Sequence, residues 1–134
     1  MTNTVDIKIF KDPANPPTHD IPDVPWFAGI TVLEAMIIGE AMYHKANFEF
    51  RVKYRSVYGA YIDSIDGLAD ADKPNHFWML YINGQSSKYG ASESLLFEDD
   101  TTTSVLVEWK YEDMAAHKEH PQLARRTGAL PRAA

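Results

Sequence analysis

The sequence predicts an α+β domain in which one main helix packs on a four- to five-stranded mixed sheet. Several stretches alternate apolar and polar residues with the period of a strand, one stretch has a helical period and a helix-start signature, and turn residues separate them. The chain has 134 residues, of which 45% are hydrophobic, which is enough for one core. We therefore expect a single domain over residues 1–114 and a tail over residues 115–134.

The first predicted strand covers residues 5–9, where Val5, Ile7 and Ile9 alternate with polar residues. Residues 12–29 then form a proline-rich insert, and because each proline removes a backbone donor, we expect an irregular loop or an extended crossover. The insert also holds apolar residues that a solvated linker would lack: Ile21, Val24, Trp26 and Phe27. We therefore expect it to pack against the body of the domain.

The main helix is predicted to start at Thr31. Thr31 and Glu34 have the spacing of a capping box, in which the threonine side chain accepts from an early helical amide and Glu34 bonds back to the threonine amide. The helix is expected to fade near residues 45–47. Its broad apolar face consists of Val32, Leu33, Ala35, Met36, Ile37, Met42 and Tyr43. Gly39 costs about 1 kcal/mol relative to alanine, which indicates close packing against the sheet.

The clearest strand pattern lies at residues 48–55, where apolar residues alternate with glutamate, arginine and lysine. Such a strand has one buried face, and its charged face is expected to see water. A second strand is predicted through Tyr61 and Ile65. The acidic stretch 66–75 contains glycine and proline and is expected to form a surface loop.

Two more strands complete the predicted sheet. An aromatic strand around Trp78 runs into Asn83 and Gly84, a strong hairpin signal because both residues tolerate a positive φ. The pair marks either a simple turn or the start of a loop that faces a ligand. The last strand is expected at residues 103–111, with these residues on one face: Val105, Val107, Trp109 and Tyr111.

Composition and charge exclude several classes of function. The net charge of −6 argues against nucleic acid as a partner, because phosphates call for a basic surface. No apolar run approaches the roughly 20 residues of a membrane span, and the start lacks the features of a signal peptide, so we expect a cytoplasmic protein with no membrane partner. The absence of cysteine excludes disulfides, thiolate metal sites and a cysteine nucleophile.

The tail at residues 115–134 has an excess of basic side chains, and its prolines and glycine prevent a long helix. We expect it to be mobile or docked on a partner. His117 and His120 are three residues apart, but no third ligand lies near them in the sequence, so we predict no metal site. The acidic loop likewise lacks the spacing of a calcium-binding hand.

The order of these segments resembles the C-terminal domain of transcobalamin and intrinsic factor and related small bacterial domains, over about residues 5–112. The segments that carry the resemblance are TVLEAM, FEFRV, YGAYIDSIDGL, FWMLYINGQSSKYGAS and SVLVEWKY. The resemblance implies a compact β-grasp-like fold, with Trp78, Gly84 and Gly90 matching the strand tryptophan, the turn glycine and the loop-closing glycine of the family.

The same resemblance implies a ligand. In the cobalamin carriers the loop after the aromatic strand approaches one side of the cofactor, so cobalamin or another bulky small molecule is the implied ligand. The carriers hold cobalamin between this domain and a large helical domain, and a lone domain of this type would supply half of that grip. The residues expected to line an aromatic pocket are Trp26, Tyr58, Tyr61, Trp78 and Tyr81. The polar contacts are expected from Gln85, Ser86, Ser87, Lys88 and Tyr89.

An alternative function is a small cofactor-independent isomerase, lyase or hydrolase that works by proton transfer. His44 follows Glu40 by four residues on the helix, so the two can share a face, and a carboxylate can orient an imidazole as a general base. Asp63 and His76 lie on or beside the central strands. An aspartate buried among aromatic rings would have a raised pKa, which suits it to proton transfer.

A third alternative is an interaction subunit of a larger cytosolic assembly, in which the aromatic insert and the basic tail contact a protein partner. An open sheet also leaves an edge strand, so a homo-oligomer formed by strand pairing or by exchange of the helix and tail is a further expectation. The small-molecule ligand remains the first expectation.

Overall fold

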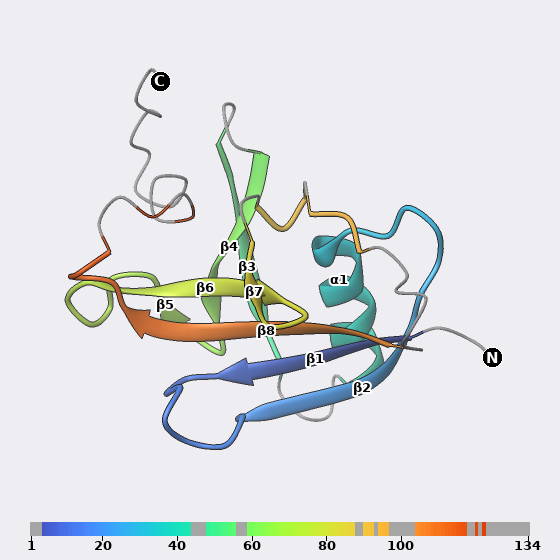
Figure 1. Cartoon of the computed structure of the whole chain (residues 1–134), viewed down its shortest axis with the longest axis horizontal. Coiled ribbons are helices and arrows are strands. Elements are labelled where there is room, and N and C mark those ends of the chain that lie inside the picture. The colour runs from blue at the N-terminus through green and yellow to red at the C-terminus, as the bar shows by residue number, and fades with distance from the viewer. Residues whose placement is uncertain are drawn as a thin grey trace.

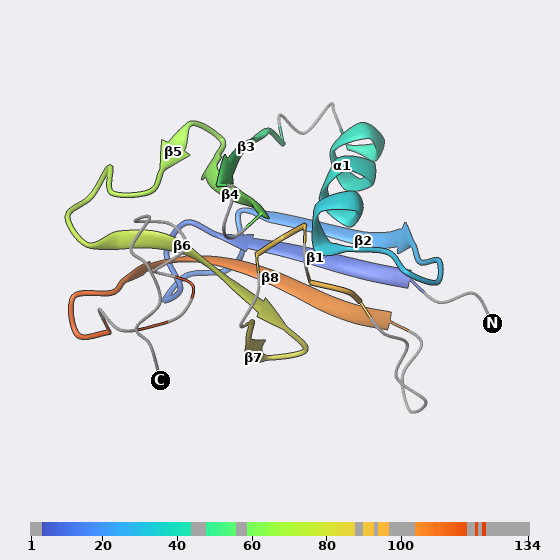
Figure 2. The same cartoon turned by 90° about the horizontal axis from the view of Figure 1, so that it is seen from above.

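The computed structural model describes residues 4–43, 48–55, 59–87, 90–92, 94–96, 104–117, 120 and 122. Its elements, in chain order, are β1 (Thr4–Phe10), β2 (His19–Pro25), α1 (Val32–Met42), β3 (Phe50–Arg55), β4 (Gly59–Ile65), β5 (Leu68–Ala69), β6 (His76–Ile82), β7 (Gln85–Ser86) and β8 (Ser104–Asp113). Figures 1 and 2 show α1 and the three strands β3, β4 and β5 on the same side of a larger sheet.

The larger sheet has the strand order β2-β1-β8-β6-β7. The pair β1 and β8 is parallel, whereas the other pairs are antiparallel, so the sheet is mixed. This confirms the predicted α+β class with one helix on a mixed sheet. The strands β3, β4 and β5 form a separate antiparallel sheet of three strands, which the sequence pattern did not distinguish from the main sheet.

The proline-rich insert contains a strand that we did not predict. Part of it forms β2, which pairs antiparallel with β1, so the expectation of an irregular loop or crossover is wrong over His19–Pro25. Pro22 and Pro25 are compatible with a strand here because β2 is an edge strand and needs donors on one side only. The expected packing of the insert is confirmed, since Ile21 and Val24 are 2% and 0% exposed.

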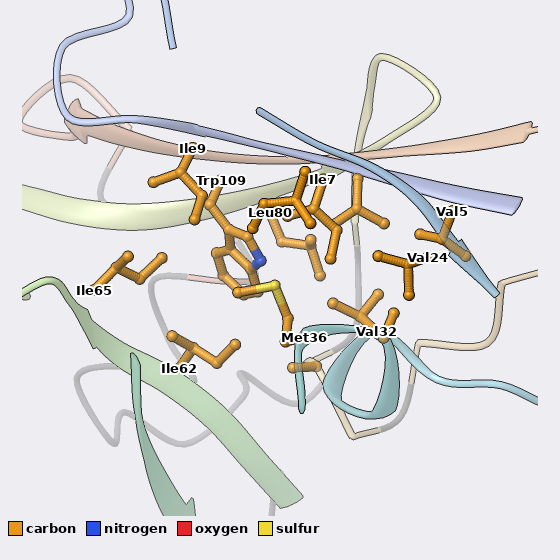
Figure 3. Close-up of a cluster of buried hydrophobic side chains, with 14 of the residues drawn as sticks. Val5, Ile7, Ile9, Val24, Val32, Met36, Ile62, Ile65, Leu80 and Trp109 are labelled. Carbon is orange, nitrogen blue, oxygen red and sulfur yellow. The ribbon is translucent and has the colours of Figure 1, made fainter. Parts of the chain in front are cut away.

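The core lies between the main sheet, α1 and the inner face of the three-stranded sheet (Figure 3). The alternation of β1 is confirmed, with Val5, Ile7 and Ile9 fully buried. On β8, the four residues predicted to share a face are all buried. Figure 3 shows Met36 of α1 and Ile62 of β4 pointing into the same cluster.

The capping box of α1 is confirmed. Glu34 N donates to Thr31 Oγ1, and Thr31 N donates to Glu34 Oε1, each over 3.1 Å. The helix ends at Met42, earlier than predicted. Its apolar face is narrower than predicted, because Ile37 and Met42 are 52% and 46% exposed. A helix that is apolar on all sides can bury only the side that meets the sheet.

The close packing predicted for Gly39 is confirmed. A Cβ atom at this position would lie 3.2 Å from Ile7 Cδ1 and 3.6 Å from both Ile21 Cγ2 and Val24 Cγ2. The glycine therefore lets the helix approach β1 and β2.

Within the described ranges, no helix combines the length and the apolar character that a membrane span requires.

Candidate ligand-binding site

A hollow of about 360 Å³ lies beside the three-stranded sheet and β6. We call it the Arg51 pocket, and its lining residues are Arg51, Lys53, Tyr61, Asp63, Ala69, Asp70, Ala71 and Phe77. Two of them, Tyr61 and Asp63, are predicted site residues. The pocket combines four charged side chains with two aromatic ones.

The strands β3 and β4 bring the polar side chains of the pocket together. Their register places Lys53 opposite Tyr61, and an irregularity between Arg51 and Val52 shifts the pairing near the start of β3. Such a shift changes the direction of neighbouring side chains. Arg51 Nε donates to Asp63 Oδ1 and Arg51 Nη2 donates to Asp63 Oδ2, each over 3.2 Å. Lys53 Nζ lies 3.9 Å from Asp63 Oδ2.

The carboxylate is buried, whereas the two cations are exposed. The side chain of Asp63 is 6% exposed, and those of Arg51 and Lys53 are 65% and 60% exposed. A guanidinium has five N–H donors, and Asp63 accepts from two of its nitrogens, so other donors remain for solvent or a ligand. The hydrogen bond and the negative charge of Asp63 raise the pKa of Arg51, which keeps this side chain cationic.

The loop after β4 forms one wall of the pocket and is held by hydrogen bonds. Asp70 N donates to Asp63 O over 2.8 Å. The Asp70 carboxylate accepts from Trp78 N, also over 2.8 Å, and Trp78 Nε1 donates to Leu68 O over 2.7 Å. The buried tryptophan of β6 therefore positions the loop against which Asp63 packs.

The predicted aromatic wall is only partly assembled among the described residues. Tyr61 is 4% exposed and lines the Arg51 pocket. Trp78 is fully buried, and its ring centre lies 5.1 Å from that of Tyr111, so it is part of the core. Tyr58 lies outside the described residues.

Trp26 and Tyr81 lie at other places on the domain. Trp26 is half-buried, and its Nε1 donates to Leu96 O over 2.8 Å. Tyr81 is half-buried, donates to Glu112, and has Lys110 Nζ 4.7 Å from its ring centre. Neither Trp26 nor Tyr81 lines the Arg51 pocket.

The predicted hairpin is confirmed. Asn83 and Gly84 have φ values of 49° and 81°, and positive φ at both positions is what a tight hairpin turn of this kind needs. Gln85 and Ser86 are exposed on β7, and Ser87 is 9% exposed. The other two residues of the predicted ligand-facing loop lie outside the described ranges: Lys88 and Tyr89.

The predicted catalytic residues do not share a hollow in the described part of the chain. Asp63 lines the Arg51 pocket, and both of its carboxylate oxygens accept from Arg51. His76 lines a separate hollow of about 330 Å³ with Lys11 and Lys73, and its Nδ1 is 2.9 Å from a backbone carbonyl. His44 lies outside the described residues. Asp63 is therefore placed as the charge partner of a guanidinium, not as a free proton acceptor.

The sequence analysis missed Arg51 and Lys53 as candidate binding residues. The alternation of β3 predicted a charged face in water, and both side chains are indeed exposed. Their spacing of two residues places them on the same face of a strand, which is a signal in the sequence. Which residue pairs with Arg51 depends on the register between β3 and β4. The alternation of β3 does not determine that register.

Among the described residues, no group of three or more histidine, aspartate or glutamate side chains is arranged to hold a metal ion. His120 instead has its Nε2 2.9 Å from Ser86 Oγ, and its Nδ1 accepts from Gln122 N over 3.1 Å.

Comparison with known proteins finds a matching family and several similar solved structures. A family profile described as a domain of unknown function, DUF4430, matches residues 30–112. The crystal structure of haptocorrin in complex with Cbi is similar at 20% identity and a TM-score of 0.63, covering 83% of this chain and 25% of the haptocorrin chain. A proposed metal-binding protein from Ruminococcus gnavus has 12% identity and a TM-score of 0.47, with 82% of this chain and 98% of that chain covered.

The likeness to haptocorrin bears on the fold alone and agrees with the transcobalamin-like fold expected from the resemblance. The chain corresponds to a quarter of the haptocorrin chain. No protein with a curated description matches the sequence.

Proposed function

The chain belongs to the DUF4430 family, and we propose that it is a small-molecule-binding module that holds an anionic ligand in the Arg51 pocket. The observation that carries this proposal is the arrangement of charges. A buried carboxylate holds one guanidinium through two hydrogen bonds and lies near one ammonium, and both cations remain open to solvent. A cation that is already oriented loses less side-chain entropy when it binds a ligand.

The ligand that fits this chemistry has a carboxylate or phosphate joined to a planar or apolar body. Arg51 and Lys53 bind the anionic group through charge-assisted hydrogen bonds. The apolar body lies against Tyr61 and Phe77, which line the same hollow. A volume of about 360 Å³ is at the lower end of the range for ligand pockets, which favours a small molecule.

A direct test is calorimetric titration of the full chain with benzoate, which carries one carboxylate on a planar ring. Arg51→Gln is expected to weaken binding about tenfold or more, because a hydrogen bond to a charged group is lost. Lys73→Gln is the matched control, since Lys73 is exposed and does not line the pocket. Equal affinity in the wild type and in Arg51→Gln would overturn the proposed site.

A corrinoid is a second candidate ligand, favoured by the likeness to haptocorrin, whose structure is described as a complex with Cbi. The Arg51 pocket is too small to enclose so large a molecule, so a corrinoid would have to lie across the surface of the domain. Incubation with hydroxocobalamin followed by desalting tests this candidate. A visible chromophore retained at one per chain would support it, and a colourless protein would leave the likeness as one of fold.

A further inference from the structure

Most of β6 has a strand partner on one side only. On one side, β8 pairs with the whole length of β6, from His76 to Ile82. On the other side, β7 pairs only with Tyr81 and Ile82, at one end of the strand (Figure 1). Leu80 precedes that short pair. Its side chain is buried in the core (Figure 3), so only its backbone is available at this edge.

The carboxamide of Gln122 occupies this position. Leu80 N donates to Gln122 Oε1 over 2.7 Å, and Gln122 Nε2 donates to Leu80 O over 2.8 Å. Gln122 Nε2 also donates to Ser86 Oγ over 3.1 Å. Gln122 is 3% exposed, and its two bonds to Leu80 are shielded from water. We call the Leu80 backbone and the Ser86 hydroxyl together the Leu80 notch.

The donors and acceptors of the Leu80 notch match those of a primary carboxamide. The notch offers one N–H donor beside two acceptors, the Leu80 carbonyl and the Ser86 hydroxyl, and a primary carboxamide presents one acceptor beside two N–H donors. A carboxylate would place a negative oxygen against the Leu80 carbonyl, and an ammonium has no acceptor for Leu80 N. Leu80 O also accepts from Ser87 N over 3.0 Å, whereas Leu80 N donates to Gln122.

The notch and its occupant come from different parts of the chain. Leu80 and Ser86 lie within residues 30–112, which match the DUF4430 family, whereas Gln122 lies beyond that range. Gln122 is positioned by its neighbour His120, which accepts from Gln122 N and contacts Ser86. The part of the chain that defines the family therefore presents the notch, and a segment outside it supplies the group that fills it.

We propose that the Leu80 notch is a binding site for a primary carboxamide and that Gln122 is its built-in competitor. A carboxamide presented in trans displaces Gln122 and makes the same three hydrogen bonds. The group can be carried by a small molecule or by a glutamine or asparagine in an extended partner segment. The notch is distinct from the Arg51 pocket, since none of its residues lines that hollow.

The test follows the Leu80 amide by NMR in the full-length chain. In Gln122→Ala the hydrogen exchange of Leu80 N–H is expected to rise about tenfold or more, because a buried donor has lost its acceptor. Added acetamide is expected to shift the Leu80 and Ser86 signals along a saturating curve and to slow the exchange again. N,N-dimethylacetamide is the matched control, because it keeps the carbonyl oxygen and has no N–H to donate.

The two sources of the carboxamide are separated by a capped tripeptide, acetyl-Ala-Gln-Ala-N-methylamide. Saturation at a concentration at least about tenfold below that of acetamide would assign the notch to a partner segment, because additional backbone bonds then contribute. Saturation at a similar concentration would assign it to the carboxamide group alone. Gln122→Asn, which keeps the carboxamide on a shorter side chain, is the second variant if Gln122→Ala does not fold.

Three results would overturn the proposal. If Leu80 remains protected in the folded variant, Gln122 does not hold this donor. If Leu80 exchanges faster but neither acetamide nor the tripeptide gives a saturating response, Gln122 is a structural residue and the notch binds nothing in trans. An equal response to acetamide and N,N-dimethylacetamide would also contradict recognition of the N–H group.

Discussion

At the scale of single residues, Asp63 is buried, whereas the two cations beside it, Arg51 and Lys53, are exposed. The role of Asp63 depends on this difference. The carboxylate is 6% exposed, and Arg51, which it orients, is 65% exposed. An Asp63→Asn variant loses the negative charge and one acceptor, so Arg51 is no longer held in one position. We expect benzoate affinity to fall about tenfold. This is less than the loss of binding that removal of a bidentate charged pair can cause. Calorimetric titration measures it.

The control for that variant is Asp20→Asn, because Asp20 is exposed on β2 and lies outside the pocket. It should bind benzoate as the wild type does. Tighter binding by Asp63→Asn would show that the carboxylate repels the ligand more than it orients Arg51, and the proposed role of Asp63 would be wrong.

Gly39 gives a second prediction at this scale. Gly39→Val is expected to destabilise the domain by about 1–3 kcal/mol, because its side chain would overlap fully buried Ile7 and its neighbours. Ala41→Val adds similar bulk at an exposed position of the same helix and should cost only a few tenths of a kcal/mol in helix propensity. Urea denaturation compares them, and equal losses would contradict the close approach of α1 to β1.

Two of the residues that line the Arg51 pocket, Tyr61 and Asp63, were candidate site residues in the sequence, and both are buried. Residues 60–65 of β4 are all buried, so burial does not alternate along this strand. The sequence pattern does not predict the pairing of Asp63 with Arg51, because that pairing depends on the register of β3 and β4 and on the irregularity after Arg51. Trp78 was expected in the pocket wall because it is aromatic, but the same property suits it to the core.

At the scale of elements, the start of α1 is the clearest case in which a local signal determines structure. The capping box provides acceptors for two backbone amides at the first turn, those of Thr31 and Glu34. We expect Thr31→Ala to reduce the free energy of unfolding by about 1 kcal/mol. Thr31→Ser keeps the hydroxyl and should lose much less. Chemical denaturation of the two variants decides the point, and equal stability of both would mean that the cap contributes little.

The strand β2 shows where element prediction fails. Prolines normally argue against a strand, and β2 contains Pro22 and Pro25. Two spatial facts make the strand possible: it lies at the edge of the sheet, and its apolar residues Ile21 and Val24 cover the core. The first depends on the order of strands in space, which a local pattern does not contain.

At the scale of the whole molecule, two tyrosines with raised pKa values make stability sensitive to alkaline pH. Burial, followed by a hydrogen bond and the charges of Glu112 and Glu108, raises the pKa of Tyr81 above its ordinary value of 10.0. Burial also raises the pKa of Tyr111. Above pH 10 the unfolded chain loses these protons while the folded chain keeps them, so stability is full below that pH and falls as pH rises further.

The corresponding prediction concerns the slope of stability against pH. The free energy of unfolding, measured with urea from neutral to strongly alkaline pH, should fall less steeply in Tyr81→Phe than in the wild type. The phenylalanine variant has no phenolic proton at this position. An identical slope in both proteins would mean that Tyr81 ionises alike in the folded and unfolded states.

Two residues of the tail contact the main sheet, which bears on where the domain ends. The sequence predicts a domain that ends at residue 114, yet His120 and Gln122 bond to β6 and β7. These contacts are hydrogen bonds between side chains and the edge of a strand. They produce no apolar periodicity, so the sequence pattern does not reveal them. The overall class was predictable because it rests on periodicity, whereas the contacts of the tail rest on individual hydrogen bonds.

The measurement that tests the central proposal most directly is an NMR titration of the isotopically labelled full chain with benzoate. If the Arg51 pocket binds anions, the signals of the Arg51 Nε–H group and of the Tyr61, Ala69 and Phe77 amides will shift together with one dissociation constant. Inorganic phosphate should shift the Arg51 signal and affect the aromatic residues less. No shift at Arg51, or shifts confined to residues outside the pocket, would contradict the proposed function.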